Sequence, residues 1–147
     1  MSRPTTRIFL ALITFLLTSA AGAQDFDKCI SGQIRVQSFG EVKVTRENYC
    51  YDQELVNFVS ESCRHRKCEA FRGAYRYYAQ DFLGPFGTPG FKLCRELGGS
   101  PEIVDFFAKG AFQRSDRCVF KDGFVDTDTL FDFYILRDGP EDDTSRP

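Results

Sequence analysis

The six cysteines constrain the fold of this chain more than any other feature of its sequence. All of them lie beyond residue 23, in a chain whose first residues look like an export signal. An even number of cysteines in a small exported chain is typical of paired disulfides, each worth about 2–4 kcal/mol of stability. We expect three structural bridges, with the pairing left open, among Cys29, Cys50, Cys63, Cys68, Cys94 and Cys118.

Residues 1–23 have the three parts of a signal peptide. Arg3 and Arg7 make the start positive, residues 8–17 form an apolar run broken only by Thr14, and small residues end the segment at Ala23. The run is shorter than the roughly 18–20 residues that span a bilayer. We therefore predict export to the periplasm or the extracellular space, without a permanent membrane anchor.

Charge and motifs narrow the possible partners. Residues 1–23 carry two arginines and no acidic residue, so the rest of the chain has 17 Lys and Arg against 21 Asp and Glu. A net negative chain disfavours a nucleic-acid partner. Export argues against cysteines as zinc ligands, and the sequence has no cofactor motif. We expect a monomer without metal or cofactor.

Two stretches alternate apolar and polar residues with the period of half-buried strands, residues 33–39 and 41–51. A three-residue hairpin loop at residues 38–40 would set Ile34 opposite Val44. The apolar side chains of both strands would then share one face.

The same register brings Cys29 and Cys50 close together but one residue out of phase. A bulge near Gly32 would be needed to join them. Residues 55–62 fit either a third strand or a short helix capped by Asp52, and we favour the strand.

One main helix and one short helix are expected. In residues 67–82 apolar side chains recur every three or four positions, and a Gly-Pro pair ends the run. Residues 91–97 form the short helix, which two glycines end. Residues 84–90 link the helices and mark a possible subdivision of the domain.

Strands are expected again in the last third of the chain. The candidates are residues 103–107, residues 117–120 and, after a tight turn at residues 122–123, residues 124–136. The acidic, Pro-containing residues 138–147 are predicted to be a disordered tail.

Together these elements predict an α+β fold. Short antiparallel strands would pack on the main helix at residues 67–82 and on the short helix. Residues 24–137 would form a single disulfide-rich domain.

The loop at residues 63–68 is the strongest candidate binding site. Its Arg64, His65, Arg66 and Lys67 hold three fixed positive charges in an acidic protein, and nearby bridges would make the loop rigid. Guanidinium groups pair bidentately with phosphate or carboxylate, so we predict an anion site for phosphate, lipid A or an acidic glycan. The alternative is a solvated basic turn that leads into a helix.

Other candidates have simpler structural explanations. His65, the only histidine, is either a general base or a solvent-facing loop residue, and we favour the second. Asp126, Asp128 and Asp132 suggest calcium, but they lack the spacing of an EF-hand loop and fit the outer face of a strand. The tyrosines within residues 75–78 fit the packed side of the helix better than a sugar-stacking platform. We assign no catalytic residue.

Cys94 precedes Gly98 and Gly99, and the string Cys118-x-Phe120-x-Asp122-Gly123 follows. Residues 94–123 thereby resemble the short domain of unknown function found in exported bacterial proteins that are labelled haemolysins. The resemblance implies a disulfide between Cys94 and Cys118 that pins a helix to a hairpin. It implies no catalytic residue.

These features favour a non-enzymatic binding or inhibitor-like module, whose partner is a protein or an anionic envelope ligand. One alternative is a small secreted hydrolase that uses His65 or a carboxylate pair. Another is a structural envelope component that assembles through exposed Phe side chains.

Overall fold

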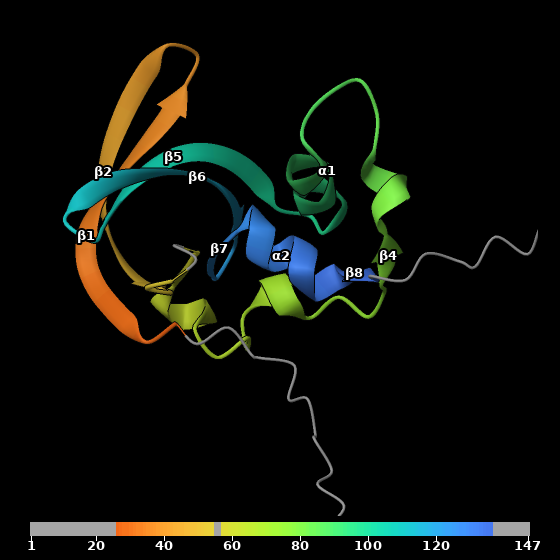
Figure 1. The fold of residues 1–147 in the computed structure, drawn as a ribbon, viewed down its shortest axis with the longest axis horizontal. Helices are drawn as coiled ribbons and strands as arrows, with labels where there is room; N and C mark the ends of the chain where they lie inside the picture. The colour runs from red at the N-terminus through yellow and green to blue at the C-terminus, as the bar shows by residue number, and fades with distance from the viewer. Residues whose placement is uncertain (1–25, 55–56, 137–147) are drawn as a thin grey trace, which may run out of the picture.

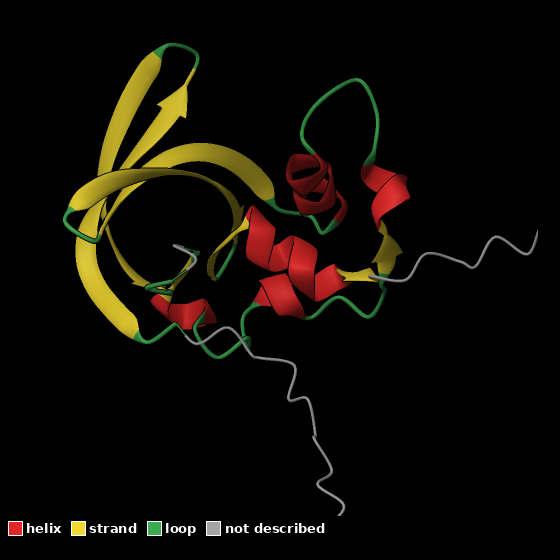
Figure 2. Cartoon of the chain, in the orientation of Figure 1, coloured by secondary structure: helices red, strands yellow, loops and turns green. Residues whose placement is uncertain are grey.

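The computed structural model describes residues 26–54 and 57–136. Most of this part is a closed antiparallel barrel with helices packed along one side (Figures 1 and 2). The barrel strands are β1 (Lys28–Ser38), β2 (Glu41–Tyr51), β3 (Phe58–Ser60), β5 (Ser100–Ala108), β6 (Ala111–Phe120) and β7 (Gly123–Asp126). They follow the order β1-β2-β3-β7-β6-β5 around the barrel.

The other elements are short and lie outside the barrel. They are the 3-10 turns η1 (Glu61–Cys63), η2 (Glu69–Phe71) and η3 (Ala79–Phe82), the helices α1 (Pro89–Glu96) and α2 (Thr127–Tyr134), and the parallel pair β4 (Tyr77–Tyr78) and β8 (Ile135–Leu136). The α+β arrangement expected from the sequence is therefore wrong, because the fold is mostly β.

No long helix forms over residues 67–82. The hydroxyl of Tyr134 accepts a hydrogen bond from the Gly73 N–H at 2.9 Å and donates one to the Ala70 carbonyl at 2.8 Å. These contacts take up backbone groups that a helix would use for its own ladder. The apolar side chains of residues 67–82 therefore do not share one helix face. Tyr75, which was expected on the packed face, is 76% exposed.

The hairpin of β1 and β2 has a two-residue turn rather than the expected three-residue loop. Phe39 (φ 46°) and Gly40 (φ 87°) both lie in the left-handed region, as a type I′ turn requires. Ile34 therefore pairs with Thr45, and Val44 faces solvent on the opposite side of the sheet. The predicted shared apolar face is wrong by one residue of register.

The corrected register explains the first disulfide. Cys29 and Cys50 are direct cross-strand partners and form a bridge, so no bulge is needed. Gly32 instead leaves room for the ring of Tyr49, because a Cβ there would lie 2.9 Å from ring carbons. The other bridges join Cys63 to Cys68 and Cys94 to Cys118, so the expectation of three disulfides is confirmed, and the last pair is the one that the resemblance implied.

The barrel is built from two equivalent three-stranded units, β1-β2-β3 and β5-β6-β7. Each begins with a hairpin closed by a left-handed two-residue turn, at residues 39–40 and 109–110. The units meet where β1 pairs with β5 and β3 pairs with β7. The string Arg-x-x-x-Cys occurs once in each unit and ends at Cys50 of β2 and at Cys118 of β6, which are corresponding strands.

α2 begins inside the strand expected at residues 124–136. The carboxylate of Asp126 accepts hydrogen bonds from the N–H of Thr129 at 2.9 Å and from its hydroxyl at 2.6 Å, which caps a helix. Leu130 and Tyr134, one turn apart, are both buried. The short helix expected before the two glycines is confirmed as α1.

Three further expected strands are confirmed, and two expected segments lie outside the described residues. β3, β5 and β6 fall on the strands expected at residues 55–62, 103–107 and 117–120, although residues 55–56 lie outside the described part. The expected signal peptide and acidic tail also lie outside it. Within the described ranges, no helix is long and apolar enough to cross a bilayer.

Two apolar clusters fill the fold. One occupies the barrel interior, where the rings of Phe58 and Phe106 stack with centroids 3.9 Å apart. The other lies between the outside of the barrel and the helices and contains all the bridged cysteines except Cys29. The Cys94–Cys118 bridge joins α1 to the barrel strand β6, whereas Cys29–Cys50 joins two barrel strands and Cys63–Cys68 closes a loop.

Arg117 of β6 makes the main polar contacts inside the barrel. Its side chain is 6% exposed, donates hydrogen bonds to Glu47 of β2 at 3.0 Å and to Glu102 of β5 at 2.9 Å, and lies over the Phe124 ring. Burial alone would raise the pKa of Glu47, but hydrogen bonds from Arg117 and Thr45 and the charge of Arg117 lower it overall. Arg117 thus links the two three-stranded units.

Arg117→Met should destabilise the protein, because it leaves two partly buried carboxylates without their partner. The expected loss is somewhat below the roughly 3–5 kcal/mol of a fully buried pair, since both glutamates keep some contact with water. Urea unfolding at neutral pH measures it, with Arg114→Met as the control, because Arg114 is exposed on the same strand. Equal unfolding midpoints for the two variants would contradict this role of Arg117.

Asp126 makes stability depend on pH. Its carboxyl is 1% exposed, and burial raises its pKa from 3.8 to about 7, against hydrogen bonds from Thr129 and from the N–H of Phe58. The folded state therefore binds this proton more tightly than the unfolded state. The associated stability is fully present below about pH 4 and is lost as the pH rises through about 7.

Asp126→Asn should flatten this dependence while it keeps a capping side chain, because an amide does not titrate. Each unit of pKa difference corresponds to about 1.4 kcal/mol. Urea unfolding of both proteins between pH 4 and 7 provides the measurement. A wild-type free energy of unfolding that falls no more steeply than that of the variant would refute the assignment.

Candidate functional site

The loop at residues 63–68 is a rigid, charged turn on the surface. The Cys63–Cys68 bridge closes it, and its backbone turns through Arg66, which has a left-handed φ of 55°. Arg64 is half-buried, whereas His65, Arg66 and Lys67 are exposed. The structure thus places the four predicted site residues together on one disulfide-closed loop.

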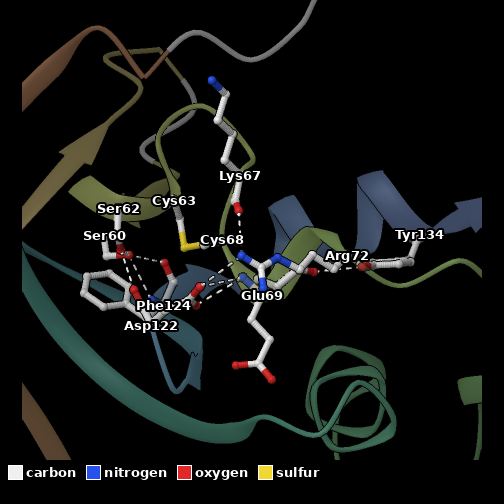
Figure 3. The surroundings of a disulfide bond; sticks show 11 residues. Ser60, Ser62, Cys63, Lys67, Cys68, Glu69, Arg72, Asp122, Phe124 and Tyr134 are labelled. Atoms are coloured by element: carbon white, nitrogen blue, oxygen red, sulfur yellow. Dashed lines mark hydrogen bonds and ion pairs between the residues drawn. A yellow bond between two sulfur atoms is a disulfide. The ribbon is translucent and has the colours of Figure 1, made fainter.

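The turn between β6 and β7 anchors this loop (Figure 3). The carboxylate of Asp122 accepts the Glu69 N–H with both oxygens, at 3.1 and 3.0 Å, and the Ser62 hydroxyl donates to the Asp122 carbonyl at 2.7 Å. A Cβ at Gly123 would collide with the hydroxyls of Ser60 and Ser62, so only glycine permits this close approach. The loop is held from both of its ends.

Two further arginines extend the site, which we call the cationic surface. Residues 64–76 contain five Lys and Arg and a single acidic residue. Arg72 and Arg76 were not predicted as site residues, because they lie outside the loop between Cys63 and Cys68, within the helix expected at residues 67–82. The excess of positive charge in this segment is visible in the sequence, but it does not show which of these side chains lie near the loop. The cationic surface consists of Arg64, His65, Arg66, Lys67, Arg72 and Arg76.

Aromatic rings of α2 and η2 support parts of this surface. The guanidinium carbons of Arg66 and Arg76 lie 5.6 and 4.6 Å from the centroid of the Phe133 ring. Arg72 lies 4.0 Å from the Asp122 carboxylate, but both side chains are well exposed, so this pair adds little stability. Most of the positive charge therefore remains available to solvent.

A second candidate is a cavity of about 370 Å³ beside the first turns of α1 and α2. Asp116 and Asp128 line it, and burial followed by the charge of Asp128 raises the pKa of Asp116, against the charge of Arg114. The cavity thus has two carboxylates on its wall. His65 is not among the residues that line the cavity.

The calcium candidates are separated by the fold. Asp126 is buried as the cap of α2, whereas Asp128 and Asp132 are exposed on that helix, so the expected outer face of a strand is wrong. Among the described residues, no group of three possible ligands is placed to hold a metal ion.

Neither a protein-family model, nor a curated protein, nor a solved structure matches this chain significantly. The resemblance of residues 94–123 to haemolysin-labelled exported proteins therefore stays a prediction. The candidate site rests on its own geometry.

Tyr134→Phe should loosen the cationic surface, because it leaves the Gly73 N–H and the Ala70 carbonyl without their partner. Each unsatisfied buried group costs about 1–3 kcal/mol. Urea unfolding gives the total, and amide hydrogen exchange at Gly73 reports the local effect. Tyr75→Phe is the control, because Tyr75 is exposed. Unchanged exchange at Gly73 would argue against this anchor.

Proposed function

We propose that this chain is an exported, monomeric binding module whose cationic surface takes an acidic ligand of the cell envelope, in the periplasm or outside the cell. The observation that supports it is a cluster of exposed positive charges on a segment fixed by a disulfide, by Asp122 and by Tyr134. Three disulfides are consistent with an oxidising compartment.

Rigidity makes this surface suitable for binding. A flexible arginine or lysine loses rotamer entropy when it grips a ligand, whereas a fixed backbone lowers the cost of ordering the site. Charge-assisted hydrogen bonds from guanidinium groups to an acidic ligand are also stronger than neutral ones. An acidic ligand would therefore gain affinity here in spite of the net negative charge of the chain.

Two alternatives stay predictions. A hydrolase could use a carboxylate pair or His65. Asp116 and Asp128 line a cavity that suits the first, whereas His65 is exposed on the loop at residues 63–68 and does not line that cavity. Exposed Phe39 and Phe86 suit a structural envelope component, yet they occupy separate loops. We favour a binding module, because the cationic surface is held in place by a disulfide, by Asp122 and by Tyr134.

Replacing Arg64, Arg66 and Lys67 with Ser should abolish binding to lipopolysaccharide and to heparin, an acidic glycan. Binding of the wild type should weaken as salt rises, because the charges are exposed. The matched control replaces Lys28, Lys43 and Arg46 with Ser, which removes the same charge from the β1-β2 hairpin. Biosensor measurements compare the proteins. No wild-type binding, or equal binding by both triple variants, would overturn the proposal.

A further inference from the structure

We propose that the cationic surface is selective for phosphomonoesters, and that one phosphate group binds between the guanidinium groups of Arg66 and Arg76 above Phe133. This inference rests on the proposed function, because it names the chemical class of ligand for the same surface. Arg66 and Arg76 would determine the specificity for phosphate. The other positive charges of the cationic surface would attract any anion.

The geometry brings these two arginines to one ring. Their guanidinium carbons lie 5.6 and 4.6 Å from the same ring centroid of Phe133, so their separation cannot exceed the sum of the two distances. They approach from different segments, since Arg66 belongs to the disulfide-closed loop and Arg76 follows η2 by several residues. The two guanidinium groups thus lie within about 10 Å of each other, and an anion between them would be attracted by both charges.

The ring that supports them is itself fixed. Phe133 packs edge-on against Phe71 and Tyr134, with centroids 5.0 and 4.9 Å away. Arg66 also lies 6.0 Å from the Phe71 ring, and Arg76 lies 5.3 Å from that of Tyr134. Stacking uses the flat face of a guanidinium and leaves its edge N–H groups free to donate.

Those edge donors are largely unused within the fold. No described residue accepts a hydrogen bond from the Arg66 guanidinium, and Arg76 donates through one terminal nitrogen, to the carbonyls of Gly73 and Tyr75. Five N–H donors on each guanidinium exceed these contacts. The two side chains therefore present edge N–H groups that a shared ligand can take.

The arrangement of donors favours phosphate over carboxylate. A carboxylate offers two oxygens in one plane, which a single guanidinium fork already satisfies. A phosphomonoester offers three terminal oxygens in a tetrahedral arrangement and carries nearly two negative charges at neutral pH. It can accept from two forks in different planes and compensate both charges, whether it belongs to a lipid, a glycan or free phosphate.

Calorimetric titration with glucose 6-phosphate and with glucuronate tests this selectivity, because the two sugars differ mainly in their acidic group. Wild type should bind the phosphate at least about tenfold more tightly. Arg66→Lys and Arg76→Lys should each remove most of that preference, because lysine keeps the charge but loses the planar fork. Arg46→Lys is the matched control, because Arg46 is exposed on β2, outside the cationic surface, and it should retain the preference.

Inorganic phosphate and phosphatidylcholine vesicles that contain phosphatidic acid serve as further probes, so that free phosphate and a lipid phosphomonoester are compared directly. Binding of either one that is lost in the Arg66 and Arg76 variants supports the inference and identifies the source. Equal wild-type affinity for both sugars, or selectivity retained in both lysine variants, overturns it. If heparin binding persists in that case, the proposed function stands and only the phosphate site fails.

Discussion

Two seams join the three-stranded units into a closed barrel, and the loops around the candidate site depend on the shorter one, between β3 and β7. β3 and β7 pair at one position, where Val59 lies opposite Val125. On the neighbouring strands, Val59 also pairs with Cys50 of β2, and Val125 also pairs with Cys118 of β6. Each outer member carries a disulfide, to Cys29 and to Cys94. The Cys29–Cys50 bridge joins β1 to β2, and the Cys94–Cys118 bridge joins α1 to β6, so each disulfide fixes a strand that flanks this contact. On the other side of the barrel, β1 and β5 join the two units through four residue pairs.

The shorter seam also decides where the cationic surface forms. β3 runs directly into η1 and Cys63, while β7 begins at the turn that carries Asp122. Because β3 and β7 are neighbours, the loop at residues 63–68 is placed against that turn. β7 then leads into α2 (Figure 1). This helix supplies Phe133, whose ring lies near Arg66 and Arg76, and Tyr134, whose hydroxyl accepts the Gly73 N–H. A site made from three separate segments thus follows from one strand contact.

The sequence predicted local features well and long-range ones poorly, for identifiable reasons. Alternation revealed β1 and β2, but their register depended on a type I′ turn in which Phe39, rather than the usual Asn or Asp, adopts a left-handed backbone. The three-and-four spacing over residues 67–82 suggested a helix, because nothing local reveals that Tyr134, more than fifty positions away, binds the backbone of Gly73. At residues 124–136 the alternation indicated a strand, but the cap formed by Asp126 begins a helix at Thr127.

The predicted part of the site was the part encoded locally. Arg64 to Lys67 lie between two cysteines and are visible as a charged string, whereas Arg72 and Arg76 join them only after the segment is folded back onto α2. Arg117 differs from these arginines, because it lies inside the barrel and forms ion pairs with Glu47 and Glu102. Counting charges in the sequence cannot distinguish these two fates. What distinguishes the two cases is the presence of acidic partners in the fold. Arg117 has Glu47 and Glu102 beside it, whereas no ion pair among the described residues involves Arg66 or Arg76, and this difference is the basis for the proposed site.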